Sequence, residues 1–474
     1  MGAFGSLTHA RRASLINARA ISDKKERGST TNCRSGSASP LSLFTRRQGT
    51  PSTRWTATAA CLLVTLAWAL GDTAAAQVPS PEDAAPPEKK EEQLKDEEME
   101  LPPKDATLPD RPLMLRAGGS FSWDSNIFRQ PSPSEDRIGR AYIGLLVDKA
   151  YAQQRIRLDA TKTAYRYQNF KYLDFDALDY TGAWDWQLGP RIGGSIRAAR
   201  AESLANYTEF RNTGELNVHT TQNFLASGDA WLFGGWHLTG GLSRVQDRYS
   251  VPMPHQGSYR ADGWVAGARW VAPSGNWLAF NLRSLDGRYS DRMLDPVALV
   301  DDGFRRLETE ALMAWRFTGK SSLDARAAWI DYRSNQFSER DFSGIAARLR
   351  YLWIATDKIA LSVRFEREVE PWADVGASYR IDQRVTLGAA WQPGARTTLS
   401  VDATRGESDF REPLPGFAGT LRNDSGRRLQ IQAEWRALRK LSLNAAAQRY
   451  RQSSSDPAAN YRGSQVTAGA SLLF

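Results

Sequence analysis

The sequence predicts an all-β fold: a transmembrane antiparallel β-barrel of about 18 strands, preceded by a signal peptide and a disordered acidic linker. Between residues 112 and 474, apolar and polar residues alternate in one stretch after another, which places them on opposite faces of a sheet. Short turns alternate with longer polar loops, as expected for connections at two membrane surfaces. Mean hydropathy is −0.50, and no stretch reaches the about 20 apolar residues of a membrane-spanning helix, which excludes a multi-helix membrane protein.

Residues 1–76 are predicted to be a leader that contains a signal peptide. Arg54 precedes an apolar run over about residues 59–70, and the small residues Ala74–Ala76 follow. A basic flank, a short apolar run and a small-residue site are typical of a secretory signal, and we place cleavage after Ala76. The alternative for the apolar run is a buried core helix.

Residues 77–111 are predicted to be a disordered, periplasmic linker. Residues 77–110 hold eleven acidic and four basic residues together with several prolines, a composition that cannot bury a core. The linker is either a plain spacer or a segment that reaches periplasmic partners. Both cysteines, Cys33 and Cys61, precede the predicted cleavage site, so we expect no disulfide, thiolate metal site or cysteine catalysis in the mature chain.

Residues 112–474 are predicted to form the outer-membrane barrel. Alternation is clearest in Arg428–Ala437, where every odd position is apolar and every even position is polar. Eighteen strands, from one near Ala117 to one near Ala470, fill this region at about 20 residues per strand and connection. The even number predicts that both ends of the barrel lie on the periplasmic side. We expect Glu370–Tyr379 to be a loop.

A soluble β-sandwich or a β-propeller is the alternative architecture. The spacing of Trp315, Trp353 and Trp391 would suit propeller blades of about 40 residues, but each such unit contains two long strands instead of four short ones. Tryptophan also recurs just before the short turns, where a barrel carries an aromatic girdle at the membrane interface. The predicted girdle consists of Trp184, Trp186, Trp231, Trp270, Trp315, Trp353, Trp391 and Trp435.

The last strand alternates and closes on an aromatic residue, which is similar to the terminal recognition signal of bacterial outer-membrane barrels. This similarity implies recognition by the outer-membrane barrel assembly machinery. The residues of this assembly strand are Val466, Ala468, Ala470, Leu472 and Phe474.

Alternation also predicts which charged side chains line the lumen. Mixed charge with an arginine excess could line a path for anionic or hydroxyl-rich solutes, because arginine presents a fork of hydrogen-bond donors. The alternative is that these side chains are ion pairs that only cross-link the barrel interior. The candidates are Arg155, Arg157, Arg269, Arg283, Arg326, Arg348, Arg350, Arg364, Arg428, Arg436, Glu308, Glu310, Asp324, Glu366, Asp402 and Glu434.

Aromatic residues also gather near the predicted longer loops and the upper strand ends. They could stack on sugar rings or form an outer aromatic girdle, and we expect about half of them in the girdle. These residues are Tyr165, Tyr167, Phe170, Tyr172, Tyr207, Phe210, Tyr249, Tyr259 and Tyr289.

Catalysis has little support in the sequence. The histidines His219, His237 and His255 have no metal-like spacing, and there is no Gly-x-Ser-x-Gly elbow, P-loop or dinucleotide fingerprint. His219, close to Thr220 and Thr221, is the only candidate for an enzyme centre, and a lumen or surface histidine is the simpler interpretation. We therefore expect no enzyme activity, catalytic residue, cofactor or metal, and no nucleic-acid partner, since the arginines do not form one patch.

A strand that ends in Asp124-Ser125-Asn126-Ile127-Phe128-Arg129 resembles the opening of the EpsL-like family, outer-membrane proteins encoded with exopolysaccharide genes and linked to exosortase systems. The stretches 367–379 and 387–393 also resemble that family. The resemblance covers roughly residues 112–474, and the leader and linker depart from it. It implies an outer-membrane step in exopolysaccharide production or export, and it supplies no catalytic residues.

The leading hypothesis is therefore an outer-membrane channel for exopolysaccharide secretion or biosynthesis. Its expected partners are outer-membrane lipid, the polysaccharide chain, the barrel assembly machinery and periplasmic export components. The alternative is a general or small-solute porin, and the third hypothesis is a barrel enzyme that acts on lipid or glycan.

Overall fold

The computed structural model describes residues 69–70, 112–253 and 255–474. Except for Ala69 and Leu70, the predicted leader and the linker up to residue 111 lie outside the described residues. Among the described residues, no helix is long and apolar enough to cross a membrane. The helical segments are η2 (Lys171–Leu173), α3 (Tyr207–Phe210), η3 (Ser338–Arg340) and η4 (Pro457–Ala459).

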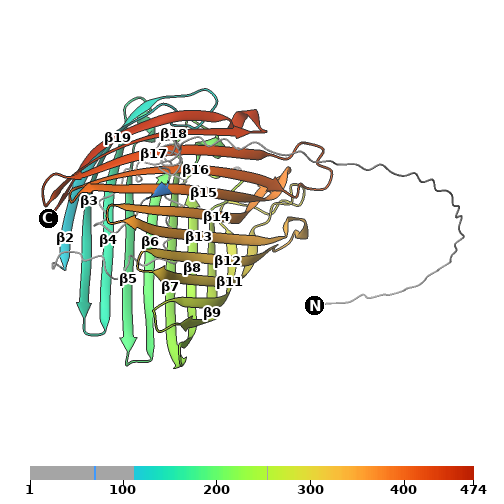
Figure 1. Cartoon of the computed structure of the whole chain (residues 1–474). Coiled ribbons are helices and arrows are strands. Elements are labelled where there is room, and N and C mark those ends of the chain that lie inside the picture. Colours follow the sequence, from blue (N-terminus) through green and yellow to red (C-terminus); the bar gives the residue numbers. More distant parts are fainter. Residues whose placement is uncertain (1–68, 71–111, 254) are drawn as a thin grey trace, which may run out of the picture. The chain divides into compact units, whose positions relative to one another are not determined.

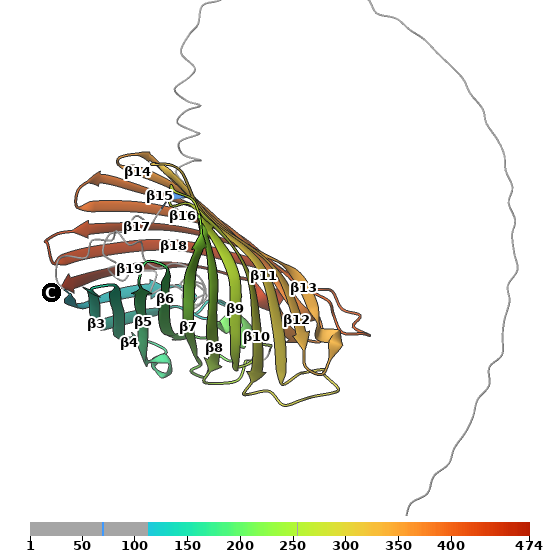
Figure 2. The ribbon, with the colours of Figure 1, turned by 90° about the horizontal axis from the view of Figure 1, so that it is seen from below.

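Eighteen long antiparallel strands, β2 to β19, follow one another in sequence order around a single sheet (Figures 1 and 2). The two-residue strand β1 (Ala69–Leu70) pairs with β16. The strands of the first half are β2 (Leu113–Asp124), β3 (Asp136–Tyr151), β4 (Gln154–Tyr167), β5 (Phe175–Leu188), β6 (Ile192–Leu204), β7 (Val218–Phe233), β8 (Trp236–Tyr249), β9 (Tyr259–Val271) and β10 (Trp277–Tyr289). Those of the second half are β11 (Gly303–Thr318), β12 (Ser321–Ser334), β13 (Phe342–Thr356), β14 (Ile359–Asp374), β15 (Ala377–Gly394), β16 (Thr397–Arg411), β17 (Asn423–Arg436), β18 (Leu441–Ser454) and β19 (Tyr461–Leu473).

The sheet closes on itself where β19 pairs with β2. Ala470 lies opposite Gly119 in this seam, and the backbone N–H of Phe474 donates to the carbonyl of Leu115 at 2.8 Å. Figure 1 shows the C-terminus beside the start of β2. The predicted closed antiparallel barrel of 18 strands is therefore confirmed, and closure leaves the sheet without an open edge.

The connections differ at the two ends of the barrel, which we call the turn side and the loop side. Turn-side connections such as 152–153 and 319–320 are two residues long, whereas loop-side connections such as 205–217 reach thirteen residues. Gly189 (φ +62°) and Gly275 (φ +82°) occupy turns with left-handed backbone, which glycine adopts without steric cost.

The outer surface of the barrel is apolar over the middle of the strands. Large outward side chains such as Ile143, Phe280 and Ile431 are 51 to 63% exposed, while their neighbours in sequence are half-buried or buried. An outward apolar band around a closed barrel is the arrangement of a membrane-spanning β-barrel, in which lipid covers those side chains.

The prediction of a loop over Glu370–Tyr379 is wrong. β14 continues to Asp374 and β15 begins at Ala377, so only two residues connect the strands. β13 pairs with β14 no further than Ala347 opposite Arg367. The end of the β14–β15 hairpin therefore leaves the wall, and both of its faces contact other parts of the protein. The local sequence, with Pro371 and Gly376, does not show that these residues form strands.

Candidate functional site

The candidate site is the inward face of the strands. The predicted lumen residues occupy the strand positions that alternate with the exposed apolar ones: Arg155 and Arg157 flank the 53% exposed Ile156. The same parity holds along the later strands for the other predicted arginines and acids. Near the turn side, Arg155 is paired with Asp148 at 2.6 Å, and Arg157 with Asp185.

A second turn-side group gathers around Asp229 on β7. Arg269 on β9 donates to one carboxylate oxygen of Asp229 at 2.7 Å, and Nδ1 of His237 on β8 lies 2.8 Å from the other. The carboxylate thus holds a cation from two strands away and orients a histidine. This arrangement fixes side chains across three neighbouring strands of the wall.

Glu308 and Glu310 on β11 belong to a deeply buried charged group on the inward face. Their side chains are 3% and 2% exposed. Nε of Arg326 donates to Glu310 at 2.9 Å and its Nη2 to Glu308, while Arg306 pairs with Glu308 at 2.6 Å. Asn281 on β10 adds a 3.0 Å hydrogen bond to Glu310. Such buried charges are stable only because each is paired.

Five arginines form a band across four adjacent strands, β12 to β15. Arg326 lies directly opposite Arg348, and Arg350 lies directly opposite Arg364. Acids separate them in part, because Arg348 pairs with Glu368 at 3.1 Å and Arg364 with Asp402 at 3.3 Å. The fifth member, Arg384, lies 3.5 Å from Glu366. We call these residues the arginine band: Arg326, Arg348, Arg350, Arg364 and Arg384.

The inward hairpin end rests on a row of aromatic side chains on the loop side of the wall. Val369 is 1% exposed and packs with Ile330, Tyr332 and Phe342. The rings of Phe304, Tyr332, Phe342 and Tyr379 stack in succession at centroid distances of 5.2, 4.6 and 4.7 Å. The opposite face of the hairpin is ionic, since Arg380 pairs with Glu370 at 2.9 Å and with Asp382 at 3.0 Å.

Arg340 ties the hairpin tip to a neighbouring loop. Its guanidinium donates to the carbonyls of Asp374 (2.6 Å) and Ala377 (2.9 Å) at the tip, and to those of Ala298 (2.9 Å) and Leu299 (3.2 Å). Burial lowers the pKa of Arg340 below its ordinary value. The side chain nevertheless remains a cation, so the tip is held by charge-assisted hydrogen bonds.

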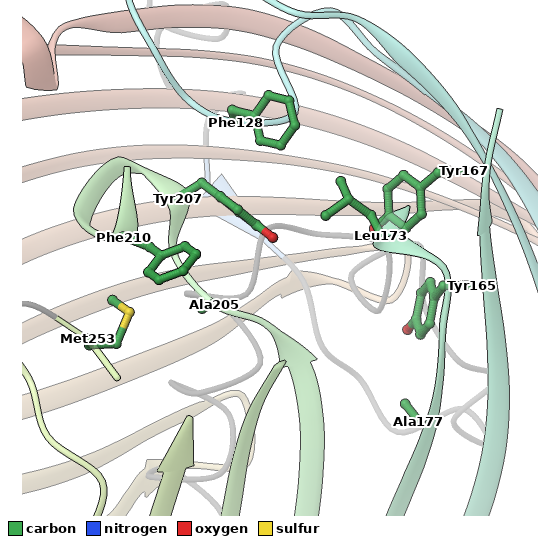
Figure 3. Packing of buried hydrophobic residues seen from close by; sticks show 9 residues of the cluster. All are labelled: Phe128, Tyr165, Tyr167, Leu173, Ala177, Ala205, Tyr207, Phe210 and Met253. Carbon is green, nitrogen blue, oxygen red and sulfur yellow. The ribbon is translucent and has the colours of Figure 1, made fainter. Parts of the chain in front are cut away.

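A second apolar cluster closes the loop-side end over the first half of the barrel. Figure 3 shows Phe128 from one connection and Tyr207 and Phe210 from another, gathered with Tyr167 and Leu173. Phe128 contacts the rings of Phe170 and Tyr207 at 4.9 and 5.2 Å. Burial raises the pKa of Tyr207 to about 12. Tyr165, Tyr167, Tyr207 and Phe210 are therefore neither an outer girdle nor exposed sugar-stacking rings, because loop packing buries them.

The connection that carries α3 reaches across the mouth of the barrel. Arg422, before β17, pairs with Glu209 of α3 at 2.7 Å, and Arg211 pairs with Asp456 at 2.6 Å. Since β6 and β7 do not neighbour β17 or β18, these two ion pairs join different sides of the mouth. Burial lowers the pKa of Arg422, but hydrogen bonds to Glu209 and Asp424 raise it above the ordinary value.

The only enzyme candidate, His219, is buried beside a carboxylate. Its Nε2 lies 2.6 Å from Asp247, to which Thr221 also donates at 3.0 Å, and its ring stacks on Tyr249 at 4.3 Å. The hydroxyl of Thr221 thus contacts the carboxylate, not the histidine. In the described part of the chain no cluster of His, Cys, Asp or Glu could hold a metal ion.

Seven of the eight girdle tryptophans lie on the outward parity near the turn side. Trp184, Trp353, Trp391 and Trp435 are 41 to 51% exposed there. Trp231 is the exception: it pairs with His237, which faces the lumen with Asp229, so its placement in the girdle is wrong. Neighbouring residues of a strand face opposite sides of the sheet, and Leu232 faces outward at this end of β7. Trp231 therefore faces the lumen. Val466 and Leu472 on β19 and Phe474, which follows it, are outward and 40 to 50% exposed.

The residues of the Asp124–Arg129 motif lock the loop-side end of the closing seam. The Asp124 carboxylate accepts hydrogen bonds from the Asn126 N–H (2.9 Å), the Tyr450 hydroxyl (2.7 Å) and both Nη atoms of Arg129 (3.0 and 2.8 Å). The Asn126 side chain donates to the carbonyl of Arg462 at 3.1 Å. The motif therefore connects β2 with β18 and β19.

Several lumen residues were absent from the predicted set. Half of them lie toward the ends of strands, and the other half lie in the β14–β15 hairpin, of which only Glu370 falls within the predicted loop Glu370–Tyr379. A strict parity count extended over whole strands would have found most of them. These residues are Arg116, Asp148, Asp185, Asp229, Arg306, Glu368, Glu370, Arg380, Asp382 and Arg384.

No family model matches the sequence, and no curated protein matches it either. Among solved structures, the chain is similar to the outer membrane protein OpdK from Pseudomonas aeruginosa, with 12% identity and a TM-score of 0.45 over 76% of this chain and 99% of that one. It is also similar to OccK2 (OpdF) of the same organism in complex with glucuronate, with 11% identity and a TM-score of 0.44 over 77% and 97% of the two chains. Acinetobacter baumannii OccAB3 matches at 8% identity and a TM-score of 0.43 over 76% and 99%.

Proposed function

We propose that this protein is an outer-membrane channel for small anionic or hydroxyl-rich solutes. In this proposal residues 1–76 direct the chain to the periplasm and residues 77–111 remain there as a linker. The barrel places its turn side toward the periplasm and its loop side outward, as short turns and long loops are arranged in other outer-membrane barrels.

The arginine band is the observation that carries the proposal. Arginines directly opposite one another on neighbouring strands repel each other, so a wall that holds the pairs Arg326–Arg348 and Arg350–Arg364 favours an anion close by. A carboxylate or hydroxyl group of a passing solute can replace a lumen acid as the acceptor of hydrogen bonds from these arginines. Because acids and arginines are nearly balanced, we expect a modest preference for anions.

Ion selectivity in planar bilayers tests this function. In a salt gradient, the purified protein should give a reversal potential that favours anions. The double variant Arg350→Gln/Arg364→Gln should move it toward cations, since two lumen charges are lost. The matched control Arg166→Gln/Arg333→Gln removes two charges from the outer surface and should leave the reversal potential unchanged. A protein that inserts but never conducts contradicts the proposal, as does equal behaviour of the two variants.

The resemblance of residues 124–129 to the EpsL-like family supports a second proposal, a role in exopolysaccharide export. Deletion of the gene should then reduce surface polysaccharide while leaving uptake of small solutes unchanged. A small-solute channel predicts the reverse, namely impaired uptake with normal surface polysaccharide.

A further inference from the structure

A row of arginines crosses four adjacent strands on the outside of the barrel, at the loop side. Arg405 on β16 lies opposite Arg427 on β17, Arg427 lies opposite Arg451 on β18, and Arg451 lies opposite Arg462 on β19. All four side chains are exposed and share the outward parity of their strands. We call these four residues the outer arginine row. In it, like charges face one another three times, at Cβ separations of about 5 Å.

Most of the outer arginine row has no internal counter-charge. Arg405 pairs with Glu407 at 2.7 Å, but the side chains of Arg427, Arg451 and Arg462 form no hydrogen bond or ion pair with the described residues. The outward positions of β17, β18 and β19 contain no acid. Directly opposed like charges destabilise a sheet, so the wall in this sector is built for an anion that is not part of the barrel.

Several outward arginines elsewhere on the loop-side rim have acidic partners on the same surface. Arg166 pairs with Asp176 at 2.8 Å, Arg244 with Asp262 at 2.5 Å, and Arg333 with Asp331 at 3.1 Å. In each of these exposed ion pairs, the charge of the arginine is compensated by the neighbouring carboxylate. Arg166, Arg244 and Arg333 therefore have a counter-charge on the barrel surface, which Arg427, Arg451 and Arg462 do not have among the described residues.

The outer arginine row lies where lipid headgroups begin. Arg427 is eight residues from Trp435 along β17, which is about 27 Å along a strand and about 20 Å in height at a tilt of about 40°. The outward residues between them, Leu429, Ile431 and Ala433, are apolar and face the lipid. The row follows directly after this band, at the level of the phosphate groups of the loop-side leaflet.

We propose that the outer arginine row binds the headgroup phosphates of a phosphorylated glycolipid in the outer leaflet. Several guanidinium forks at one height match clustered phosphates, which arginine binds with two parallel hydrogen bonds. Bound phosphate also removes the repulsion within the row. The proposal rests on the loop side facing the outer leaflet and is independent of what passes through the lumen.

Binding to vesicles of defined composition tests this site. The probes are phosphatidylcholine vesicles with bis-phosphorylated lipid A, the same vesicles with dephosphorylated lipid A, and inorganic phosphate alone. The full-length folded protein should prefer the first. Each arginine near an anionic surface contributes a factor of about five, so Arg427→Gln/Arg451→Gln/Arg462→Gln should bind at least about tenfold less tightly. The control Arg166→Gln/Arg244→Gln/Arg333→Gln removes as many charges from the paired rim and should lose less than about twofold.

Thermal unfolding in lipid-free detergent separates binding from misfolding. Without phosphate lipid the triple row variant should unfold at the same temperature as the unchanged protein or higher, since repulsion is relieved, and added lipid A should stabilise only the unchanged protein. The proposal would be overturned if both triple variants lost the same affinity for lipid A vesicles, or if the protein bound dephosphorylated lipid A equally well. It would also be overturned if a second copy of the protein covered the outer arginine row in place of lipid. Failure of conductance alone would not affect it.

Discussion

Replacement of Asp124 by alanine should be among the most destabilising single changes in the barrel. The carboxylate is 4% exposed, and its partner Arg129 is 11% exposed. The change removes four hydrogen bonds, from the Asn126 N–H, the Tyr450 hydroxyl and two Nη atoms of Arg129. It also leaves a buried guanidinium without its counter-charge.

The expected loss follows from that burial. Removing one partner of a buried ion pair costs about 3–5 kcal/mol, mostly because the remaining charge is left unpaired. Arg129 contacts the Tyr450 ring, whose centroid lies 4.0 Å from the guanidinium carbon, and because the variant keeps this contact, it does not alter the difference. The free energy of unfolding of Asp124→Ala should therefore fall by about 3–5 kcal/mol.

Urea unfolding of the barrel in lipid vesicles, followed by tryptophan fluorescence, measures this loss. Asp176→Ala is the matched control, because it breaks the exposed pair with Arg166 and should cost less than about 1 kcal/mol. Tyr450→Phe keeps the ring but removes the hydroxyl, and should cost about 1.5–3 kcal/mol as a lost hydrogen bond to a charged group. If Asp124→Ala costs no more than Asp176→Ala, the seam is not held in this way.

Two further outcomes concern the loop side. Arg340→Ala removes the donors that hold the β14–β15 tip, so the tip should loosen, and single-channel current should become larger or noisier than with the exposed control Arg333→Ala. The Arg211–Asp456 pair should weaken in acid: burial raises the pKa of Asp456, but hydrogen bonds from Arg211 and the Ala458 N–H hold it below the ordinary value. The contribution of this pair to stability is complete above the ordinary pKa of an aspartate and is lost as the pH falls through the lowered pKa of Asp456. Hydrogen exchange of residues 205–217 at pH 7 and pH 3 can measure this loss.

Alternation was sufficient to predict the barrel because a strand that separates lipid from a polar lumen needs a period of two along its whole length. β17 shows this most clearly, since its outward residues Leu429, Ile431 and Ala433 are apolar. The β14–β15 hairpin was missed for the same physical reason. Once its end leaves the wall, both faces pack against protein, Val369 on one side and Arg380 on the other, so no apolar–polar period remains to detect.

The arrangement of the lumen was predictable only in part, because parity gives the face of a side chain but not its neighbours across strands. Arg326 and Glu308 were each expected inside, yet their contact depends on the register between β11 and β12. Register follows from the turn geometry and bulges, such as the shift between Arg316 and Thr318. The Trp231 error has the same origin, since one position along β7 separates the lipid face from the lumen.

Arg427 and Arg428 show why the charge of this chain has to be interpreted face by face. They are sequence neighbours, but Arg427 lies outward among Arg405 and Arg451, whereas Arg428 lies inward opposite Thr404 and Tyr450. A positive charge in the lumen can act on a solute that passes through, and one on the outer rim can act only on lipid or another protein. The lumen arginines are largely balanced by acids, whereas Arg427, Arg451 and Arg462 have no acidic partner among the described residues, so the uncompensated positive charge of this sector lies on the outer face of the wall.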